Sequence, residues 1–260
     1  MVDLSPKAHK LQIVMGIFSV ILIFSILVAI PYLSKDPTSH LQTIKKNGVL
    51  KVLTLNAAST YYQDANGDNG FEYQLAKLFA ESLGVQLSMV PVNHFSDIYP
   101  ELQFGTVDLA AAGLSEQDKK GINSIKYSPS YHQVTQQLLY RKGQHRRPKK
   151  LSDITSGVVE VIDGTSHEYL LTDLKKEAPK LSWKINEEIG PEELIELVDE
   201  GVVDYALADS HEIALQRRFY PELRIAFELG KPKLLRWALK STEDISLLKA
   251  VKAFMHDIKK

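Results

Sequence analysis

Short β-branched runs alternate with amphipathic helical segments along most of this chain. The run VLKVLTL at 49–55 is followed by a helical pattern at 71–84, and Gly84 stands where a helix cap belongs. The apolar residues that recur in this helical pattern are Phe71, Leu75, Leu78, Phe79 and Leu83. The same order returns in a strand pattern at 157–163 and in a helical pattern at 190–201, which has proline in its first turn. Such alternation predicts an α/β fold with largely parallel sheets.

Two sets of this pattern are joined by a connector at 140–150, which is rich in basic residues. With 260 residues the chain is long enough for two lobes with a cleft between them. The expected divisions are lobe 1 from 43–140 and 230–260, and lobe 2 from 141–229. The formal net charge of −1 gives no sign of nucleic-acid binding, so a solvated connector explains the basic residues better than a site for an anionic polymer.

The N-terminal segment from Ile13 to Ile30 contains no charged residue and is long enough to cross roughly 30 Å of hydrocarbon as a helix. Lys7 and Lys10 precede it, which predicts that the N-terminus stays in the cytoplasm. A cleaved signal peptide is the alternative, but its apolar stretch is usually shorter and Leu27 fits the cleavage site poorly. The expected divisions are a cytoplasmic N-terminus at 1–10, one transmembrane helix at 11–33 and a polar tether at 34–42.

Three predicted strands end in similar motifs, AAGLS, IDGTS and LADS. Ligands of open α/β sheets collect beyond the carboxyl ends of strands, where glycine allows close backbone approach and a helix start presents N–H groups to an anion. The candidate ligand-binding residues at these ends are Gly113, Ser115, Thr165, Ser166 and Asp209. Asp209 would pair with an ammonium group. Plain helix capping explains each Ser, Thr or Asp equally well when it is taken alone.

Two tyrosines, Tyr61 and Tyr62, follow the first predicted strand and are further candidates, because their rings would either stack on a ligand or pack in the core.

The sequence gives no support for a metal site or a cofactor site. The chain has no cysteine, and its eight histidines show no metal-ligand spacing. The motif DANGDNG fails the calcium-loop pattern, because Asn69 and Leu75 stand where glycine and an acid are needed. We therefore expect no metal and no cofactor.

The order of five segments carries a family resemblance. These segments are GFEYQLAKLFAESLGV, LQFGTVDLAAAGLS, YSPSYHQVTQQLLYRK, LSDITSGVVEVIDGTSHEYL and ELVDEGVVDYALADS. From Thr43 to the C-terminus the chain resembles the type II periplasmic solute-binding proteins of family 3, and especially the binding domains of membrane-bound lytic transglycosylases. The resemblance implies a two-lobed type II periplasmic-binding-protein fold with a hinge, placed in the periplasm behind a single-pass inner-membrane anchor.

The resemblance also implies roles for particular residues. Amino-acid binders of the family hold the ligand carboxylate with an arginine, and the corresponding position here is Lys120. Lysine supplies charge without the planar fork of arginine, which argues against capture of an α-amino acid. The amine-binding aspartate of the family corresponds to Asp209, and its anion-binding helix start corresponds to Thr165 and Ser166.

The expected function is binding without catalysis. Lytic transglycosylases carry a catalytic domain after the binding domain, and this chain leaves no residues for one, so we expect no enzyme activity from it. The leading hypothesis is a membrane-anchored module that senses a small peptidoglycan-derived ligand, a muropeptide or stem peptide. Three alternatives stay open: the amino-acid receptor of an ABC transporter, the regulatory part of a lytic transglycosylase whose catalytic domain lies elsewhere, and a ligand-free structural partner in an envelope complex.

Overall fold

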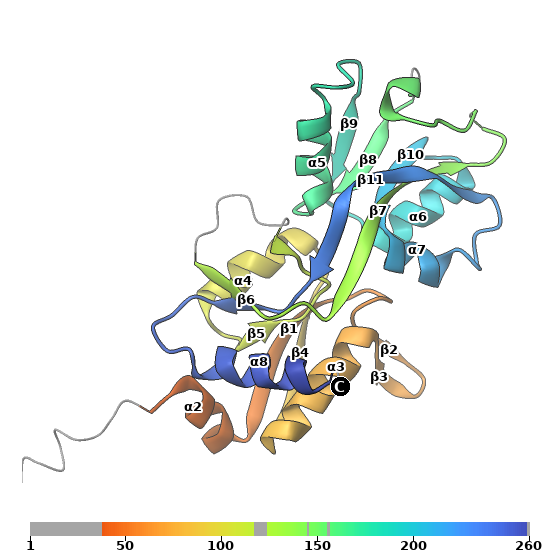
Figure 1. The fold of residues 1–260 in the computed structure, drawn as a ribbon. Coiled ribbons are helices and arrows are strands. Elements are labelled where there is room, and N and C mark those ends of the chain that lie inside the picture. The colour runs from red at the N-terminus through yellow and green to blue at the C-terminus, as the bar shows by residue number, and fades with distance from the viewer. Residues whose placement is uncertain (1–37, 117–123, 145, 155–156, 259–260) are drawn as a thin grey trace, which may run out of the picture.

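Two five-stranded sheets organise the chain, and in Figure 1 they lie one above the other. The computed structural model describes residues 38–116, 124–144, 146–154 and 157–258. The lower sheet, with the helices packed on it, is called lobe 1, and the upper sheet with its helices is called lobe 2. This arrangement confirms the predicted two-lobed α/β architecture.

Lobe 1 has the strand order β4-β1-β5-β12-β6, in which β1 is parallel to both of its neighbours and β12 is antiparallel to β5 and β6. Its strands are β1 (Val49–Leu55), β4 (Gln86–Val92), β5 (Leu109–Ala110), β6 (Ile125–Tyr127) and β12 (Ala238–Lys240), and a hairpin adds β2 (Tyr62–Asp64) and β3 (Gly67–Asn69). Its helices are α2 (His40–Asn47), α3 (Phe71–Leu83), α4 (Ile98–Phe104), which follows the short turn η1 (Phe95–Asp97), and α8 (Ser246–Asp257).

Lobe 2 has the strand order β11-β7-β10-β8-β9. Its strands are β7 (His132–Arg141), β8 (Val159–Ile162), β9 (Trp183–Asn186), β10 (Tyr205–Asp209) and β11 (Leu223–Leu235). Its helices are α5 (Ser166–Leu174), α6 (Pro191–Glu200) and α7 (Ser210–Gln216), and a short turn η3 (Leu151–Asp153) precedes β8.

Strand alternation places apolar side chains on both faces of each sheet. In β10, Leu207 packs in the buried cluster that contains Leu171 of α5, whereas Ala206 and Ala208 pack in the cluster that contains Ile195 of α6. Figure 1 shows α5 on one side of this sheet and α6 and α7 on the other. Both faces of the central strands are therefore covered, as expected for a largely parallel sheet.

The long strands β7 and β11 pair antiparallel and run from one lobe to the other in Figure 1. Both belong to the sheet of lobe 2 over their full lengths. By sheet membership, the chain therefore crosses just before His132 and again after Leu235, whereas the boundaries near 140 and 230 stay predictions. Alternation in one sequence identifies a strand but does not specify the strand with which it pairs, so the place of β7 in the sheet of lobe 2 comes from the structure alone.

The start of lobe 1 also differs from the expected tether. α2 begins at His40, because Ser39 and Gln42 form a reciprocal capping box inside the segment predicted as tether. The predicted cytoplasmic N-terminus and transmembrane helix lie outside the described residues. Within the ranges that the structure describes, no helix has the length and apolar character needed to cross a membrane.

Candidate ligand-binding site between the lobes

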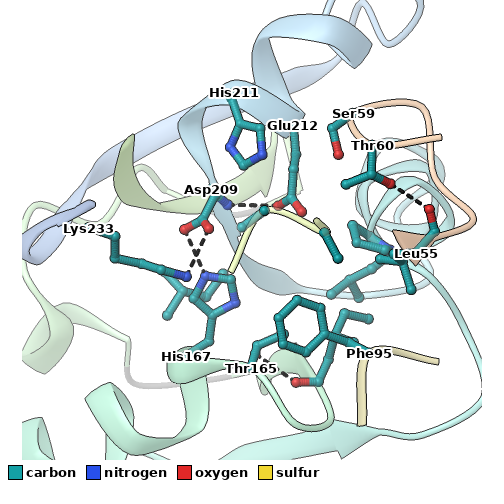
Figure 2. A pocket seen from close by; sticks show the side chains of 17 residues that line it. Leu55, Ser59, Thr60, Phe95, Thr165, His167, Asp209, His211, Glu212 and Lys233 are labelled. Atoms are coloured by element: carbon teal, nitrogen blue, oxygen red, sulfur yellow. Dashed lines mark hydrogen bonds and ion pairs between the residues drawn. The ribbon is translucent and has the colours of Figure 1, made fainter. Parts of the chain in front are cut away.

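A narrow cavity separates the two lobes, and we call it the interlobe site (Figure 2). The polar residues of its wall are Ser59 and Thr60 from lobe 1, and Thr165, His167, Asp209, His211, Glu212 and Lys233 from lobe 2. The space open to the centre of a water molecule is only about 20 Å³, which suits one water. The lobes are therefore nearly closed upon each other.

Direct contacts between the lobes explain this closure. The backbone N–H of Ala58 in lobe 1 donates a hydrogen bond of 2.8 Å to Oε1 of Glu192 on α6. Gly164 of lobe 2 has φ +76°, and a Cβ added there would lie 2.8 Å from Cα of Ser96 in lobe 1. Two backbones thus approach so closely that only glycine fits between them.

Asp209 lies at the end of β10 and caps α7, with its own N–H donating to Oε2 of Glu212 at 3.0 Å. Its buried carboxylate accepts hydrogen bonds from Nζ of Lys233 at 2.9 Å and from Nε2 of His167 at 3.1 Å. Figure 2 shows both side chains directed at the carboxylate. Burial alone would raise the pKa of Asp209, but Lys233 and His167 hold that pKa well below its usual range. The carboxylate predicted to bind a ligand ammonium already has a cation from its own chain.

Two neighbouring groups of the site, Glu212 and His211, have pKa values that favour their neutral forms. Burial, followed by the charge of Asp209, raises the pKa of Glu212 to about 8. Burial also lowers the pKa of His211. Within the described part of the chain, the buried Nδ1 atoms of His167 and His211 have no hydrogen-bond partner. The site thus combines the ion pair of Asp209 and Lys233 with two groups, Glu212 and His211, that are uncharged near neutral pH and able to hydrogen-bond.

The structure brings several other predicted residues to this region. Thr165 lines the site and its hydroxyl donates to the carbonyl of Ile162, while the Ser166 hydroxyl donates to Oε1 of Gln136 at 3.4 Å. Gly113 lines the site with φ +66°, and its N–H donates to Oε1 of Glu72. The three strand ends therefore converge, as the motifs predict.

The other candidates are placed differently. Ser115 is buried in lobe 1, where its carbonyl accepts from the hydroxyl of Tyr99 at 3.4 Å. Tyr61 is buried with its hydroxyl donating to Asp68, and Tyr62 is half-buried on β2, while Ser59 and Thr60 form the adjacent cavity wall. Lys120 lies outside the described residues.

A larger cavity adjoins the interlobe site and is called here the side cavity. It has about 470 Å³ and shares Ser59, Gly113 and His211 with the interlobe site. The rest of its wall comes from both lobes and from the two crossing segments, which are the stretches of chain around the start of β7 and the end of β11. These wall residues are Phe71, Glu72, Tyr131, His132, Ser210, Ala214, Leu215 and Leu235. The two cavities together form a site with one polar, nearly closed part and one roomier, more apolar part.

Sequence reasoning missed Lys233, His167 and His211. Lys233 carried a usable signal, because it alternates with Leu235 along β11 and both side chains are buried. A lysine at an inward-facing strand position needs a buried partner. The two histidines had no comparable signal, because each lies near a helix start where a polar residue is ordinary.

Comparisons with known proteins agree with this geometry. Residues 50–260 match the family described as bacterial extracellular solute-binding proteins, family 3. The chain is 36% identical over 259 residues to membrane-bound lytic murein transglycosylase F of Pseudomonas syringae pv. tomato, covering 99% of this chain and 50% of that protein. It is 38% identical over 227 residues to the Pseudomonas putida protein of the same name, covering 86% of this chain and 46% of that protein. The chain thus spans about half the length of these curated relatives.

Among solved structures, the ancestral amino acid-binding protein AncCDT-1, a precursor of cyclohexadienyl dehydratase, is similar with a TM-score of 0.71 and 25% identity. That match covers 85% of this chain and 94% of the other. The shared fold, the converging strand ends and the match over residues 50–260 lead to one conclusion. This chain belongs to the bacterial extracellular solute-binding proteins of family 3.

Proposed function

We propose that this chain is a solute-binding module of the bacterial envelope that takes a small peptidoglycan-derived ligand, a muropeptide or a stem peptide, between its lobes. The ligand contacts Thr165 and the histidines of lobe 2 and the Ser59–Thr60 segment of lobe 1. Its binding shifts the population of closed lobes, which a partner domain or protein can sense.

The side cavity is the observation that carries this proposal. It offers about 470 Å³ next to the polar interlobe site, and its wall includes Phe71 and Leu215. A single amino acid would leave much of the side cavity empty, whereas a short peptide or a sugar-linked peptide would fill it and reach the polar wall of the interlobe site with one end. The relatives named as lytic murein transglycosylases support a ligand that comes from murein.

The proposal includes the place of the chain in the cell. The predicted helix at 11–33 anchors it in the inner membrane, with residues 1–10 in the cytoplasm and both lobes in the periplasm. Mass spectrometry of the chain recovered from membranes should find Met1 or its immediate processing product. A mature N-terminus beyond residue 27 would contradict the anchor.

Thermal unfolding of the full chain in mild detergent tests the ligand. Muramyl dipeptide, whose peptide amino end is blocked as an amide, should raise the unfolding temperature, whereas L-arginine should not. The stabilisation should reach ~2.7 kcal/mol when the ligand concentration is 100 times its Kd. Stabilisation by L-arginine alone would instead favour the amino-acid receptor, and no stabilisation by either of them would favour a structural partner.

A pair of variants locates the binding. Ala214 is exposed on α7 and lines the side cavity, so Ala214→Trp should fill the cavity and abolish stabilisation by the peptide. Ala253→Trp makes the same change at an exposed position of α8 and should leave binding intact.

Zymography on purified peptidoglycan tests for catalysis. Because the proposed function is binding without cleavage, we expect no clearing of the peptidoglycan by this chain alone.

A further inference from the structure

The ion pair between Lys233 and Asp209 occupies the centre of the lobe 2 wall. Lys233 is 2% exposed and Asp209 is 4% exposed, and the distance from Nζ to Oδ2 is 2.9 Å. Lys233 reaches this position from β11, next to a register shift between Leu229 and Lys233. The second carboxylate oxygen accepts from Nε2 of His167. Among the described residues that line the interlobe site, Asp209 is the carboxylate that stays ionised near neutral pH, and the chain itself holds it from two directions.

An incoming ammonium group would compete with Lys233 for the same oxygens. Displacement of Lys233 would leave a buried ammonium without its counter-charge, which is strongly unfavourable. Binding of both cations would place two like charges in one small, nearly closed cavity. Either route weakens binding of a ligand that carries a free amine.

The hydrogen bond between His167 and Asp209 determines whether the other ring nitrogen of His167, Nδ1, donates or accepts a hydrogen bond. A carboxylate only accepts, so Nε2 of His167 carries the proton in this hydrogen bond. In the neutral ring, Nδ1 is then an acceptor, and this buried atom has no partner among the described residues. An amide N–H is a suitable donor for it, and the carbonyl of the same amide can accept from a protonated Glu212 or from a hydroxyl of the wall.

We propose that Lys233 determines the ligand class of the cleft: it acts as a built-in ammonium that excludes ligands with a free amino group and favours ligands whose amino end is blocked as an amide. This inference rests on the proposed function, because it names the chemical form of the peptide that the same site takes. A peptide attached through its amino end to an acyl group fits this description, whereas a free amino acid does not.

The test uses two peptides that differ only in the amino end, N-acetyl-L-alanyl-D-isoglutamine and L-alanyl-D-isoglutamine. Isothermal titration of the full chain in mild detergent should give at least about tenfold tighter binding of the acetylated peptide. Lys233→Met keeps the apolar stem and removes the ammonium, so this variant should bind the free-amine peptide at least about tenfold more tightly than the wild type does.

Two further variants serve as controls. Lys231→Met removes an exposed lysine from the same strand and should leave both affinities unchanged. The double variant Asp209→Asn with Lys233→Met removes both charges of the buried pair and should not gain affinity for the amine. It also shows whether the fold tolerates the loss of Lys233 when Asp209 is uncharged.

The outcomes separate this inference from the proposed function. Equal binding of both peptides by the wild type overturns the role of Lys233 while the peptide ligand stands. If neither peptide binds the wild type but Lys233→Met captures the free-amine peptide, the peptidoglycan-derived ligand fails and the role of Lys233 stands. A folded Lys233→Met that gains no affinity for the amine overturns the inference. If that variant does not fold, the wild-type preference between the two peptides decides.

Discussion

The indole Nε1 of Trp237 donates a hydrogen bond of 2.9 Å to the carboxylate of Glu72, although the two residues are 165 positions apart in sequence. The same carboxylate accepts from the N–H of Gly113 and from the hydroxyl of Tyr131. Glu72 is 1% exposed, and burial raises its pKa. The buried carboxyl group of Glu72 thus connects the first turn of α3 by hydrogen bonds to the strand end at Gly113 and to both crossing segments between the lobes.

Replacement of Glu72 by alanine should destabilise the fold strongly. Glu72→Ala leaves the donors of Gly113, Tyr131 and Trp237 without their buried acceptor, and an unsatisfied buried donor is expensive. We expect the free energy of unfolding to fall by about 3–5 kcal/mol in a urea titration. Glu81→Ala, at an exposed position of the same helix, should change it by less than about 0.5 kcal/mol. Equal effects of the two substitutions would contradict this role.

Glu72 also shows where prediction from sequence succeeds and where it stops. Helical spacing correctly identified α3 and its end near Gly84. The apolar face, however, was partly wrong, because Phe71 and Leu78 are 57% and 53% exposed while Glu72 is buried. A polar side chain of a helix can be buried when other residues satisfy its hydrogen bonds. For Glu72 those residues come from segments far along the chain, which local spacing does not reveal.

The candidate site divides in the same way. The strand ends at Gly113, Thr165 and Asp209 could be predicted, because α/β folds place ligands beyond strand ends and local motifs reveal those ends. The partner of Asp209 could not be predicted, because Lys233 lies 24 residues away on a strand whose register includes a shift. The spacing of apolar residues and the residue types at turns can be read from a short stretch of sequence. The pairing of buried charges depends instead on which strands lie next to each other in the fold.

The stability of the protein should fall as the pH rises because of Glu212. Its pKa is about 8 in the folded chain, against an ordinary value of 4.5. The folded state therefore keeps a proton that the unfolded chain releases, so this contribution to stability is fully present below pH 4.5 and is lost as the pH approaches 8. Glu212→Gln cannot ionise and still accepts from the N–H of Asp209. Urea titrations from about pH 5 to pH 8 should show the wild type losing stability relative to this variant.

The control for this pH dependence is Glu243→Gln, at an exposed position between β12 and α8. Its pH profile of stability should follow that of the wild type. The contribution of His211 to the pH dependence of stability has the opposite sign. Its pKa is lowered in the folded chain, so it removes stability as the pH falls below 6.5. Because His211 is present in both proteins, the difference between wild type and Glu212→Gln isolates the acid. Parallel profiles of those two proteins would contradict the raised pKa.

A methyl group at Gly164 should push the lobes apart. In Gly164→Ala the new Cβ meets the backbone of Ser96 at 2.8 Å, and neither backbone can move without separating the lobes. The chain has no cysteine, so spin labels attach only at introduced ones, for example at exposed Glu81 of lobe 1 and Lys176 of lobe 2. Pulsed electron paramagnetic resonance should show a longer distance between these labels in Gly164→Ala than in the labelled wild type.

The matched control is Gly48→Ala, which has a similar backbone angle, φ +71°, but no atom within 4 Å of the added Cβ. Both substitutions should cost about 1 kcal/mol of stability from the left-handed conformation. Only Gly164→Ala should lengthen the distance between the labels. A longer distance in both variants would mean that backbone strain, rather than contact with Ser96, opens the lobes.

Loss of the hydrogen bond between the lobes at Glu192 should expose the amide of Ala58. The backbone N–H of Ala58 in lobe 1 donates a hydrogen bond of 2.8 Å to Oε1 of Glu192 in lobe 2. In Glu192→Ala, hydrogen exchange at Ala58 should accelerate by about tenfold, because its protection depends on lobe closure and on this acceptor. Glu193→Ala removes an exposed carboxylate from the same first turn of α6, so it matches the change in charge near the helix start. Unchanged exchange in Glu192→Ala, or equal acceleration in both variants, would show that Glu192 does not hold the lobes together at Ala58.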